Sequence, residues 1–237
     1  MRLVLFDVDG TLVSTGGAGM RAFYGAMRLV FDVSVDKEVI RPDGKTDPMI
    51  AKEMLAYFGQ ANRWCAATRE VFFSSYLDCL EEEMRRAKEQ GRIRILPGVL
   101  NLLELLSRQP DFCVGLVTGN LEKGARIKLE KAGLDGYFRF GGYGSDSDDR
   151  TTLTRIGIGR GAQSIAPAAV EASFVIGDTP LDILHGHAAG AAVIAVACAK
   201  YRMEDLAPHN PDLLVGDLTP AESIVRFMRS GPRQGPG

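Results

Sequence analysis

The sequence predicts an α/β protein built on a doubly wound parallel sheet, with an all-helical segment inserted after the first strand. Three observations support this fold class: apolar runs of strand length recur along the chain, helical patterns separate most of them, and one long stretch shows only helical periodicity. Strands that alternate with helices are typical of a parallel sheet covered on both faces. With 237 residues, 46% of them hydrophobic, the chain is long enough to bury such a core.

Five short apolar runs are the expected strands of this sheet. The first, residues 3–6, reads LVLF and is apolar at every position, which is typical of a parallel strand buried on both faces. The other four runs span residues 112–117, 174–176, 192–196 and 213–215. Helical patterns lie between most of these runs, such as the apolar spacing within 99–106 and the segment from Leu121 to a helix-terminating Gly133.

The stretch from about residue 16 to residue 91 contains no convincing strand. Its apolar side chains recur at helical spacing in three groups, which fall within residues 20–31, 50–58 and 64–76. The charged run EEEMRRAKEQG is typical of a solvated helix end, with ion pairs expected between Glu81 and Arg85 and between Glu82 and Arg86. We therefore expect a helical cap in this part of the chain.

The helical stretch divides the chain into a core, a cap and a tail. The expected core domain comprises residues 1–15 and 96–229, and the expected cap domain comprises residues 16–95. Residues 230–237 read SGPRQGPG, and this Gly- and Pro-rich composition predicts a disordered tail.

The charge and cysteine content argue against several classes of partner and location. The formal net charge is -2 and the basic residues are scattered, which favours a small molecule over nucleic acid or a membrane surface as partner. No apolar run approaches the roughly 18 residues of a membrane span, and the N-terminal run is too short for a signal peptide. The four cysteines form no CxxC motif, so we expect reduced, mostly buried thiols in a cytoplasmic protein.

Polar side chains follow three of the expected strands at the point where each strand ends. Asp7 and Asp9 follow the first strand, residues 118–120 (TGN) end the second, and Asp178 and Asp182 follow the third. In open α/β sheets, ligands bind beyond the carboxyl ends of the strands, so we expect these groups to share one crevice. Crowded carboxylates raise one another's pKa, whereas a hard divalent cation neutralises them. The sequence therefore predicts a Mg²⁺ site.

Three motifs, DVDGTL at 7–12, VTGN at 117–120 and GDTPLD at 177–182, stand in this order at strand ends. With a helical insertion after the first motif, the chain resembles the haloacid dehalogenase-like hydrolase superfamily, specifically its phosphatase branch with a helical cap. The resemblance extends to about Phe227. It implies a Rossmann-like core, Mg²⁺ as cofactor, and hydrolysis of a small phosphate monoester.

The resemblance also implies roles for the first two motifs. Asp7 is implied to be the nucleophile that attacks phosphorus and forms an aspartyl-phosphate, which suits a carboxylate that is already ionised near pH 7. Asp9 is implied to protonate the leaving oxygen and later to deprotonate the hydrolytic water. Thr118 and the amides of Gly119 and Asn120 are implied to bind the transferring phosphoryl group.

The third motif is implied to complete the metal site. Asp178 would bind Mg²⁺ together with the carboxylate of Asp7 and the backbone carbonyl of Asp9. Asp182 would orient the water molecules of the metal. Taken alone, the sequence DTPLD also fits the start of a helix, so the alternative interpretation makes Asp178 and Asp182 its N-cap and first-turn residues.

The chain departs from the superfamily at the lysine that usually reaches the phosphate from a position before the third motif. The region GYGSDSDDRTTL contains no lysine, and Arg150 stands about where one is expected. Arginine keeps the charge and adds a fork of donors for phosphate, so Arg150 is the favoured cation, with Lys128 as the alternative. A merely structural Arg150 would instead pair with an acidic residue of the same loop, namely Asp146, Asp148 or Asp149.

The most polar stretch of the cap, RPDGKTDPMI, is expected to select the substrate. Lys45, Thr46 and Asp47 could reach over the crevice; in the competing interpretation, Asp47 only caps a helix that begins near Pro48. An enclosing cap favours a small ester, and phosphoglycolate-like compounds are the class that the resemblance implies. The alternatives are a phosphomutase, a 2-haloacid dehalogenase, or a non-catalytic small-molecule-binding protein. Asp9 argues against the dehalogenase, which needs no acid at that position.

Overall fold

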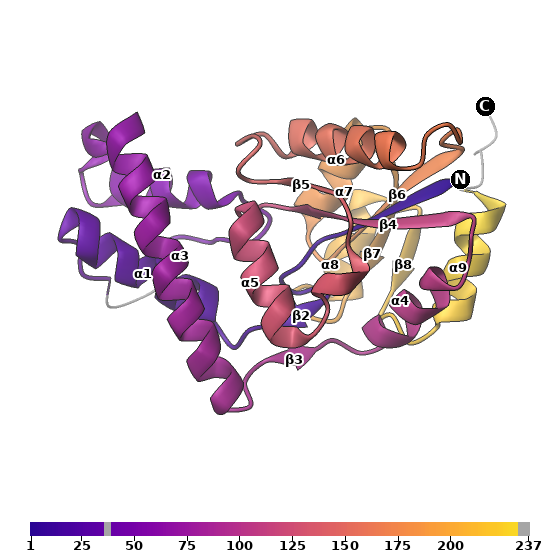
Figure 1. The fold of residues 1–237 in the computed structure, drawn as a ribbon, viewed down its shortest axis with the longest axis horizontal. Helices are drawn as coiled ribbons and strands as arrows, with labels where there is room; N and C mark the ends of the chain where they lie inside the picture. Colours follow the sequence, from indigo (N-terminus) through magenta and orange to yellow (C-terminus); the bar gives the residue numbers. More distant parts are fainter. Residues whose placement is uncertain (36–38, 232–237) are drawn as a thin grey trace.

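The computed structural model describes residues 1–35 and 39–231, in which a six-stranded parallel sheet lies beside a group of three helices (Figure 1). The order in the sheet is β5-β4-β1-β6-β7-β8, formed by β1 (Arg2–Phe6), β4 (Phe112–Thr118), β5 (Gly141–Tyr143), β6 (Ala172–Gly177), β7 (Ala192–Val196) and β8 (Leu213–Val215). All neighbouring strands are parallel. Five of the strands match predicted apolar runs, whereas β5, with the sequence GGY, contains no such run. The predicted fold class is confirmed.

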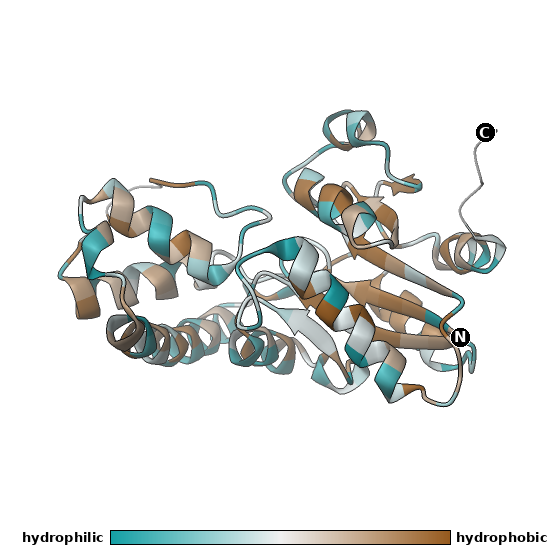
Figure 2. Cartoon of the chain, turned by 90° about the horizontal axis from the view of Figure 1, so that it is seen from above, coloured by the Kyte–Doolittle hydropathy of each residue, from teal (hydrophilic) through white to brown (hydrophobic). Residues whose placement is uncertain are grey.

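Helices cover both faces of the sheet. They are α4 (Val99–Ser107), α5 (Glu122–Ala132), α6 (Arg150–Ser164), α7 (Pro180–Ala188), α8 (Met203–Leu206) and α9 (Ala221–Ser230). Because successive side chains of a strand point to opposite faces, Val4 and Phe6 of β1 pack with α4, α5 and α9, while Leu3 and Leu5 pack with α6, α7 and α8. Figure 2 shows the strands as a hydrophobic layer and the helices with mixed hydropathy. The sheet is therefore doubly wound, as predicted.

The cap is formed by α1 (Ala18–Phe31), α2 (Asp47–Tyr57) and α3 (Ala66–Glu89), with the 3₁₀ turn η1 (Ala61–Arg63) between the last two. Its hydrophobic core is distinct from those of the sheet domain and rich in aromatic side chains, with the ring centroids of Phe23 and Tyr76 4.2 Å apart. The described part of residues 16–91 contains no strand. Because α3 contacts α5, the cap is supported by the sheet domain.

The charged end of α3 has one of its two predicted ion pairs. Arg86 Nε lies 2.7 Å from Glu82 Oε1, as expected. The predicted pair between Glu81 and Arg85 is wrong, because Glu81 faces α5 and pairs with Lys131 there, while Arg85 pairs with Glu82. A helix surface that packs on a neighbour thus has partners that spacing along one helix does not predict.

Two short antiparallel strands, β2 (Val13–Ser14) and β3 (Arg94–Ile95), lie where the chain enters and leaves the cap. The sheet domain also contains the 3₁₀ turns η2 (Asp135–Tyr137) and η3 (Ala207–His209). At the other end, α9 continues to Ser230, the first residue of the predicted tail. Residues 232–237 of that tail lie outside the described residues.

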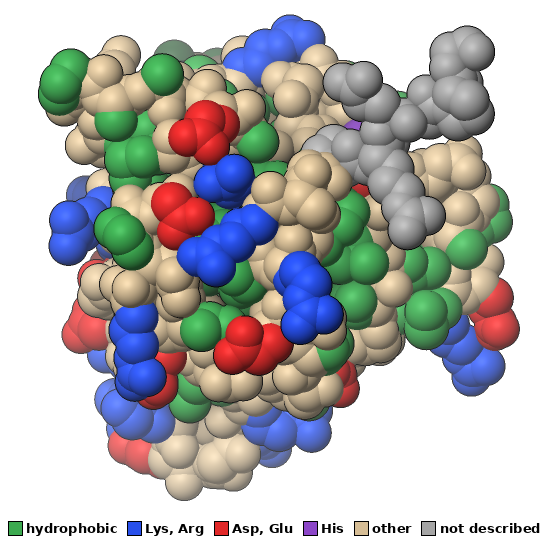
Figure 3. Space-filling model, turned by 90° about the vertical axis from the view of Figure 1, so that its right-hand side faces the viewer, with side chains coloured by type: hydrophobic (Ala, Val, Ile, Leu, Met, Phe, Trp, Pro, Cys, Tyr) green, Lys and Arg blue, Asp and Glu red, His purple; other side chains and the backbone are tan. Residues whose placement is uncertain are grey.

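Charged side chains of both signs are mixed on the surface of the described residues. On the face shown in Figure 3, acidic and basic side chains of the described residues are interspersed and form no continuous basic area. Within the described ranges, no helix is long and apolar enough to cross a membrane. The four cysteines are free, but the expectation that they are mostly buried is wrong: Cys65 is exposed at the start of α3, and the others are half-buried.

Candidate active site

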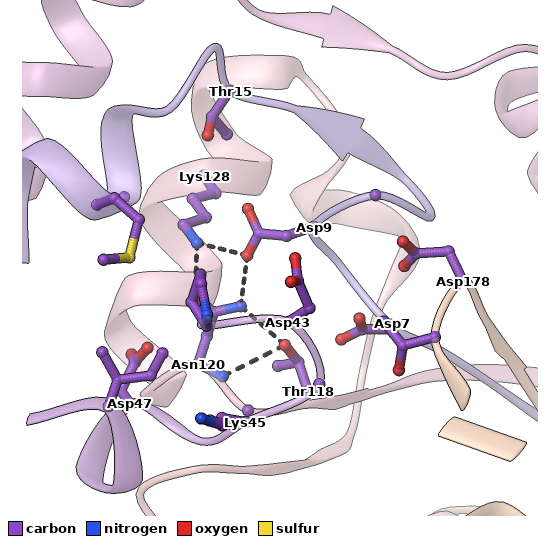
Figure 4. Close-up of a pocket in the computed structure, with 18 of the residues that line it drawn as sticks. Asp7, Asp9, Thr15, Asp43, Lys45, Asp47, Thr118, Asn120, Lys128 and Asp178 are labelled. Carbon is purple, nitrogen blue, oxygen red and sulfur yellow. Dashed lines mark hydrogen bonds and ion pairs between the residues drawn. The ribbon is translucent and has the colours of Figure 1, made fainter. Parts of the chain in front are cut away.

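The carboxyl ends of β4, β1 and β6 meet in one crevice, because these strands are neighbours in the sheet. Thr118 ends β4, Asp7 follows β1, and Asp178 follows β6. The cap closes over these ends, and a cavity of about 310 Å³ lies between the two parts. The three predicted motifs therefore line one pocket between core and cap (Figure 4).

Three buried carboxylates form a candidate metal centre at the floor of the pocket. Asp7, Asp178 and Asp182 each offer an oxygen, and these oxygens lie within 4.8 Å of one another. Burial and the charge of Asp182 raise the pKa of Asp7 to about 7. Burial and the charges of Asp182 and Asp7 raise the pKa of Asp178 well above its usual range. A hard divalent cation relieves this repulsion, and a set of carboxylate oxygens fits Mg²⁺.

The loop after β1 brings Asp178 close to this strand. Gly10 has a φ of +82°, and a Cβ at this position would lie 2.3 Å from Asp178 Oδ2. Only glycine is therefore compatible with this approach. Thr11 then donates a hydrogen bond from Oγ1 to Asp178 Oδ1 at 3.0 Å, which holds the carboxylate in the cluster.

Arg150 provides the positive charge next to this carboxylate cluster. It is the first residue of α6, its side chain is 5% exposed, and it donates a hydrogen bond to Asp182. Its charge lowers the pKa of Asp7 and so opposes the effect of burial. The expected region before the third motif thus delivers a guanidinium beside Asp7.

The acidic residues of the loop before Arg150 have other partners. Asp146 pairs with Arg160, Asp148 pairs with Lys52 of the cap, and Asp149 caps α6 by accepting a hydrogen bond from Thr152 N. Arg150 is therefore directed into the pocket and away from its own loop. The purely structural pairing with that loop is not found.

Asp182 connects the arginine to the start of α7. One carboxylate oxygen accepts the hydrogen bond from Arg150, and the other accepts from Thr179 N at 3.0 Å and from Thr179 Oγ1 at 2.7 Å. These bonds form a capping box in which Thr179 is the N-cap and Asp182 lies in the first turn. The structure thus gives the N-cap to Thr179, while Asp178 remains free to point into the cluster.

A second polar group lies on the side of the pocket that faces the cap. Lys128 Nζ lies 2.5 Å from Asp9 Oδ2 and donates to Asn120 Oδ1 at 2.6 Å. Asn120 Nδ2 in turn donates to Asp9 Oδ2 and to Thr118 Oγ1, both at 2.8 Å (Figure 4). Asp9 is therefore bonded to Lys128 and Asn120, apart from the three clustered carboxylates.

The polar loop of the cap is bonded to the TGN loop of the core. Asp47 N donates to Gly119 O at 2.7 Å, and Leu121 N donates to Asp47 Oδ2 at 2.8 Å. Thr46 caps α2 by accepting from Met49 N, so the interpretation of Asp47 as the helix cap is wrong. The Asp47 carboxylate is turned toward the core because the backbone amide of Leu121 offers it a donor.

Asp47 lies in a largely buried setting. Burial raises its pKa to about 7, against the charge of Lys128 and hydrogen bonds from Leu121 N and Tyr76. Burial also raises the pKa of Tyr76 well above its usual range, so its hydroxyl stays protonated and can donate to Asp47. The contact between cap and core therefore contains a carboxyl that titrates near neutral pH.

Lys45 also lines the pocket, but its charge is compensated within the cap. Its ammonium lies 2.5 Å from Glu53 Oε2. Its carbonyl oxygen would lie 2.1 Å from a Cβ at Gly119, so the loop can sit this close only over a glycine. In the same loop, Asp43 pairs with Lys200 of the sheet domain.

A comparison with protein-family models matches this chain over most of its length. The model of haloacid dehalogenase-like hydrolases covers residues 4–184, and a second model of related hydrolases covers residues 155–221. The chain belongs to the haloacid dehalogenase-like hydrolases.

Several known proteins are similar to this haloacid dehalogenase-like hydrolase over nearly the whole chain. The probable phosphatase IndB of Dickeya dadantii is 29% identical over 214 residues, which are 90% of this chain and 88% of that protein. The pyrophosphatase PpaX of Listeria welshimeri is 26% identical over 223 residues, 94% of this chain and 95% of that protein. The crystal structure of a hydrolase from Pseudomonas syringae has a TM-score of 0.69 at 19% identity, covers 95% of this chain and 97% of its own, and shows the shared fold.

The pocket of this haloacid dehalogenase-like hydrolase is lined by every predicted site residue except Thr46 and Asp182. Thr46 caps α2, and Asp182 accepts a hydrogen bond from Arg150 next to the carboxylates of Asp7 and Asp178. Sequence reasoning missed Thr11 and Tyr76. Thr11 could have been found as part of DVDGTL, whereas Tyr76 occupies an apolar helix position, so its spacing gave no sign of a polar role.

Proposed function

We propose that this hydrolase is a Mg²⁺-dependent phosphatase that cleaves a small phosphate monoester through an aspartyl-phosphate at Asp7, in the manner of a phosphoglycolate phosphatase. The observation that supports it most directly is the position of Asp7. This residue lines the pocket and belongs to the carboxylate cluster, and the charge of Arg150 lowers its pKa. Phosphoryl transfer needs a nucleophile beside fixed positive charge, because negative charge on the equatorial oxygens must be stabilised.

The reaction takes place in two steps. In the first, a carboxylate oxygen of Asp7 attacks phosphorus, the bond between phosphorus and the leaving oxygen breaks, and Asp9 gives that oxygen a proton. In the second, Asp9 takes a proton from water, whose oxygen attacks the phosphorus of the aspartyl-phosphate. The bond to Asp7 then breaks, inorganic phosphate leaves, and both carboxyl groups return to their initial states.

The metal would be held at the carboxylate cluster. Asp7, Asp178 and the backbone carbonyl of Asp9 are the groups proposed to bind it, and Asp182, held by Arg150 and Thr179, would orient the water molecules of the metal. When bound, Mg²⁺ supplies positive charge to the carboxylates and to the phosphoryl group. Thr11 keeps Asp178 oriented toward the site through its hydrogen bond.

The phosphoryl oxygens would be bound by groups from two loops. Thr118 Oγ1 and the backbone amides of Gly119 and Asn120 lie at the start of the segment that leads into α5. Arg150 lines the same pocket from the first turn of α6. Its guanidinium takes the place of the usual lysine and keeps the positive charge that the phosphate requires.

The size of the pocket supports a small phosphorylated metabolite as substrate. A pocket of about 310 Å³ between cap and core has the size of a small-ligand site, which favours a small molecule over a protein or nucleic-acid chain. We retain the expectation that the enzyme is cytoplasmic. A phosphomutase would use the same residues, and analysis of the product distinguishes it, because a mutase releases a rearranged sugar phosphate and a phosphatase releases inorganic phosphate.

The test is a screen of small phosphate esters with phosphate release as the readout, with and without Mg²⁺. The proposal requires turnover of at least one ester with Mg²⁺ and loss of that turnover in EDTA. Trapping of phosphate on Asp7, detected by mass spectrometry after rapid quenching, would identify the intermediate. Undiminished turnover in EDTA would contradict the proposed dependence on Mg²⁺.

A further inference from the structure

Two buried cations lie in the pocket, on different sides of Asp9. Arg150 is buried beside the carboxylate cluster, and Lys128 is 3% exposed and bonded to Asp9 and Asn120. In the view of Figure 4, Asp9 lies between Lys128 and Asp178. The two positive charges therefore face different ends of a bound substrate.

The ammonium of Lys128 lies next to Asp9, which is proposed to contact the leaving group of the substrate. Asp9 is the group proposed to protonate the leaving oxygen, and Lys128 is bonded to the same carboxylate. Helix α1 bounds this region from the cap, since a Cβ on Gly19 would lie 3.3 Å from Lys128 Nζ. A leaving group that contacts Asp9 under the cap is therefore adjacent to Lys128.

One N–H of Lys128 is available to such a group. An ammonium has three donors, and in the part of the chain that the structure describes, Asp9 and Asn120 accept two of them. The nearby carboxylate of Asp47 is engaged by Leu121 N and Tyr76. A buried ammonium is stabilised by further negative acceptors, so this position favours an anionic ligand group.

We propose that Lys128 binds a negative charge on the leaving group, so that the preferred substrates are phosphate esters or anhydrides whose leaving group is itself anionic, a carboxylate or a second phosphate. This inference rests on the proposed phosphatase function and narrows its substrate class. Lys45, the other lysine of the pocket, is less suited because it is more exposed and pairs with Glu53 of the cap, whereas Lys128 is buried and pairs with Asp9, the group proposed to contact the leaving oxygen.

The test compares substrates that differ in the charge of the leaving group. 2-Phosphoglycolate and pyrophosphate have anionic leaving groups, while 2-hydroxyethyl phosphate has a neutral leaving group of similar size to glycolate. We would measure kcat/KM with Mg²⁺ for wild type, Lys128→Met and Lys123→Met. Lys123 is an exposed residue of the same helix outside the pocket, so its substitution removes the same charge elsewhere.

In the wild type, we expect at least one anionic substrate to exceed 2-hydroxyethyl phosphate in kcat/KM by tenfold or more. Lys128→Met should lower kcat/KM for that substrate by about 10- to 100-fold, the range for a lost hydrogen bond to a charged group. Lys128→Met should also lower kcat/KM for 2-hydroxyethyl phosphate, because Lys128 is bonded to Asp9, but by about tenfold less than for the anionic substrate. Lys123→Met should change neither. Pyrophosphate and 2-phosphoglycolate separately report whether the bound anion is a phosphate or a carboxylate.

Several results would overturn this inference without touching the proposed function. An equal loss on all substrates means that Lys128 only positions Asp9, and a selective loss in Lys45→Met instead moves the anion site to the cap loop. A wild type without preference for anionic leaving groups rejects the inference even if Lys128→Met does not fold. If the wild type hydrolyses no phosphate ester, the proposed function itself fails.

Discussion

The two sides of the pocket are built in different ways. On the core side, Asp7, Asp178 and Arg150 stand directly after strands or at the first residue of a helix, so the sheet itself brings them together. On the cap side, Asp47 and Tyr76 come from two helices that reach the site only because the cap docks on the core. We therefore expect the core side to serve the chemistry of every substrate and the cap side to control closure, while the proposed anion contact at Lys128 comes from α5 of the core where it meets the cap.

The largest effect is expected at the nucleophile. Asp7→Asn keeps the shape of the side chain but removes the attacking carboxylate, so kcat should fall by about 10⁴-fold or more on every substrate. The fold should survive, because the substitution also removes one of the mutually repelling buried charges. Phosphate release and a thermal melt measure the two effects. Asp32→Asn, an exposed change in the cap, is the control, and comparable losses in both variants would contradict a role for Asp7.

A somewhat smaller effect is expected for the residue between the two sides. Asp9→Asn removes the acid and base but keeps a hydrogen-bonding group for Lys128 and Asn120, so the loss should be about 10²- to 10⁴-fold. The loss should be greater for an alkyl phosphate than for nitrophenyl phosphate, whose leaving group needs no proton. Steady-state rates on both esters measure this difference. Equal losses would assign Asp9 a structural role.

The guanidinium tests whether the core side serves all substrates alike. Arg150→Ala should lower kcat by about 10²- to 10³-fold, because a fixed positive charge near the phosphoryl group is lost, and it also leaves the buried Asp182 without its partner. Arg150→Lys should recover part of the rate by restoring the charge without the fork. Rates on anionic and neutral-bodied esters should fall in parallel. A loss confined to the anionic or to the neutral-bodied esters would mean that Arg150 contacts the leaving group.

The same division explains what the sequence could predict. That Asp7, Asp9 and Asp178 share one pocket could be predicted from the sequence alone, because a strand end fixes where the next residues lie, and parallel strands share one edge. Arg150 could be located by its distance along the chain from the motifs. The strand β5 could not be predicted, because its GGY sequence has no apolar run and it is recognised as a strand only by its pairing with β4.

On the cap side, the sequence predicted which loop lies near the crevice but not the contacts that this loop makes. Lys45 and Asp47 were correctly expected near the crevice, because turn residues interrupt the helical pattern there. That Asp47 accepts from Leu121 N depends on how the cap packs against the core, and that Lys45 pairs with Glu53 depends on how the cap loop folds back on α2. Contacts of that kind have no periodicity in the sequence, and the same reason accounts for the unexpected pair between Glu81 and Lys131.

The smallest expected effect concerns Asp47 and separates the cap side from the core side by pH. Its pKa is about 7 in the folded protein against an ordinary value of 3.8, so between these values the folded state holds a proton that the unfolded state has lost. Stability should therefore fall as pH rises from about 4 to about 7 and level off above.

Asp7 adds a similar fall in stability, which bound Mg²⁺ should suppress by favouring the charged form of Asp7, whereas the contribution of Asp47 should persist. In Mg²⁺, Asp47→Asn should flatten the dependence of Tm on pH by a few degrees across this window, because the amide cannot ionise but still accepts from Leu121 N. Parallel Tm curves for wild type and variant would show that the cap is held closed by other contacts.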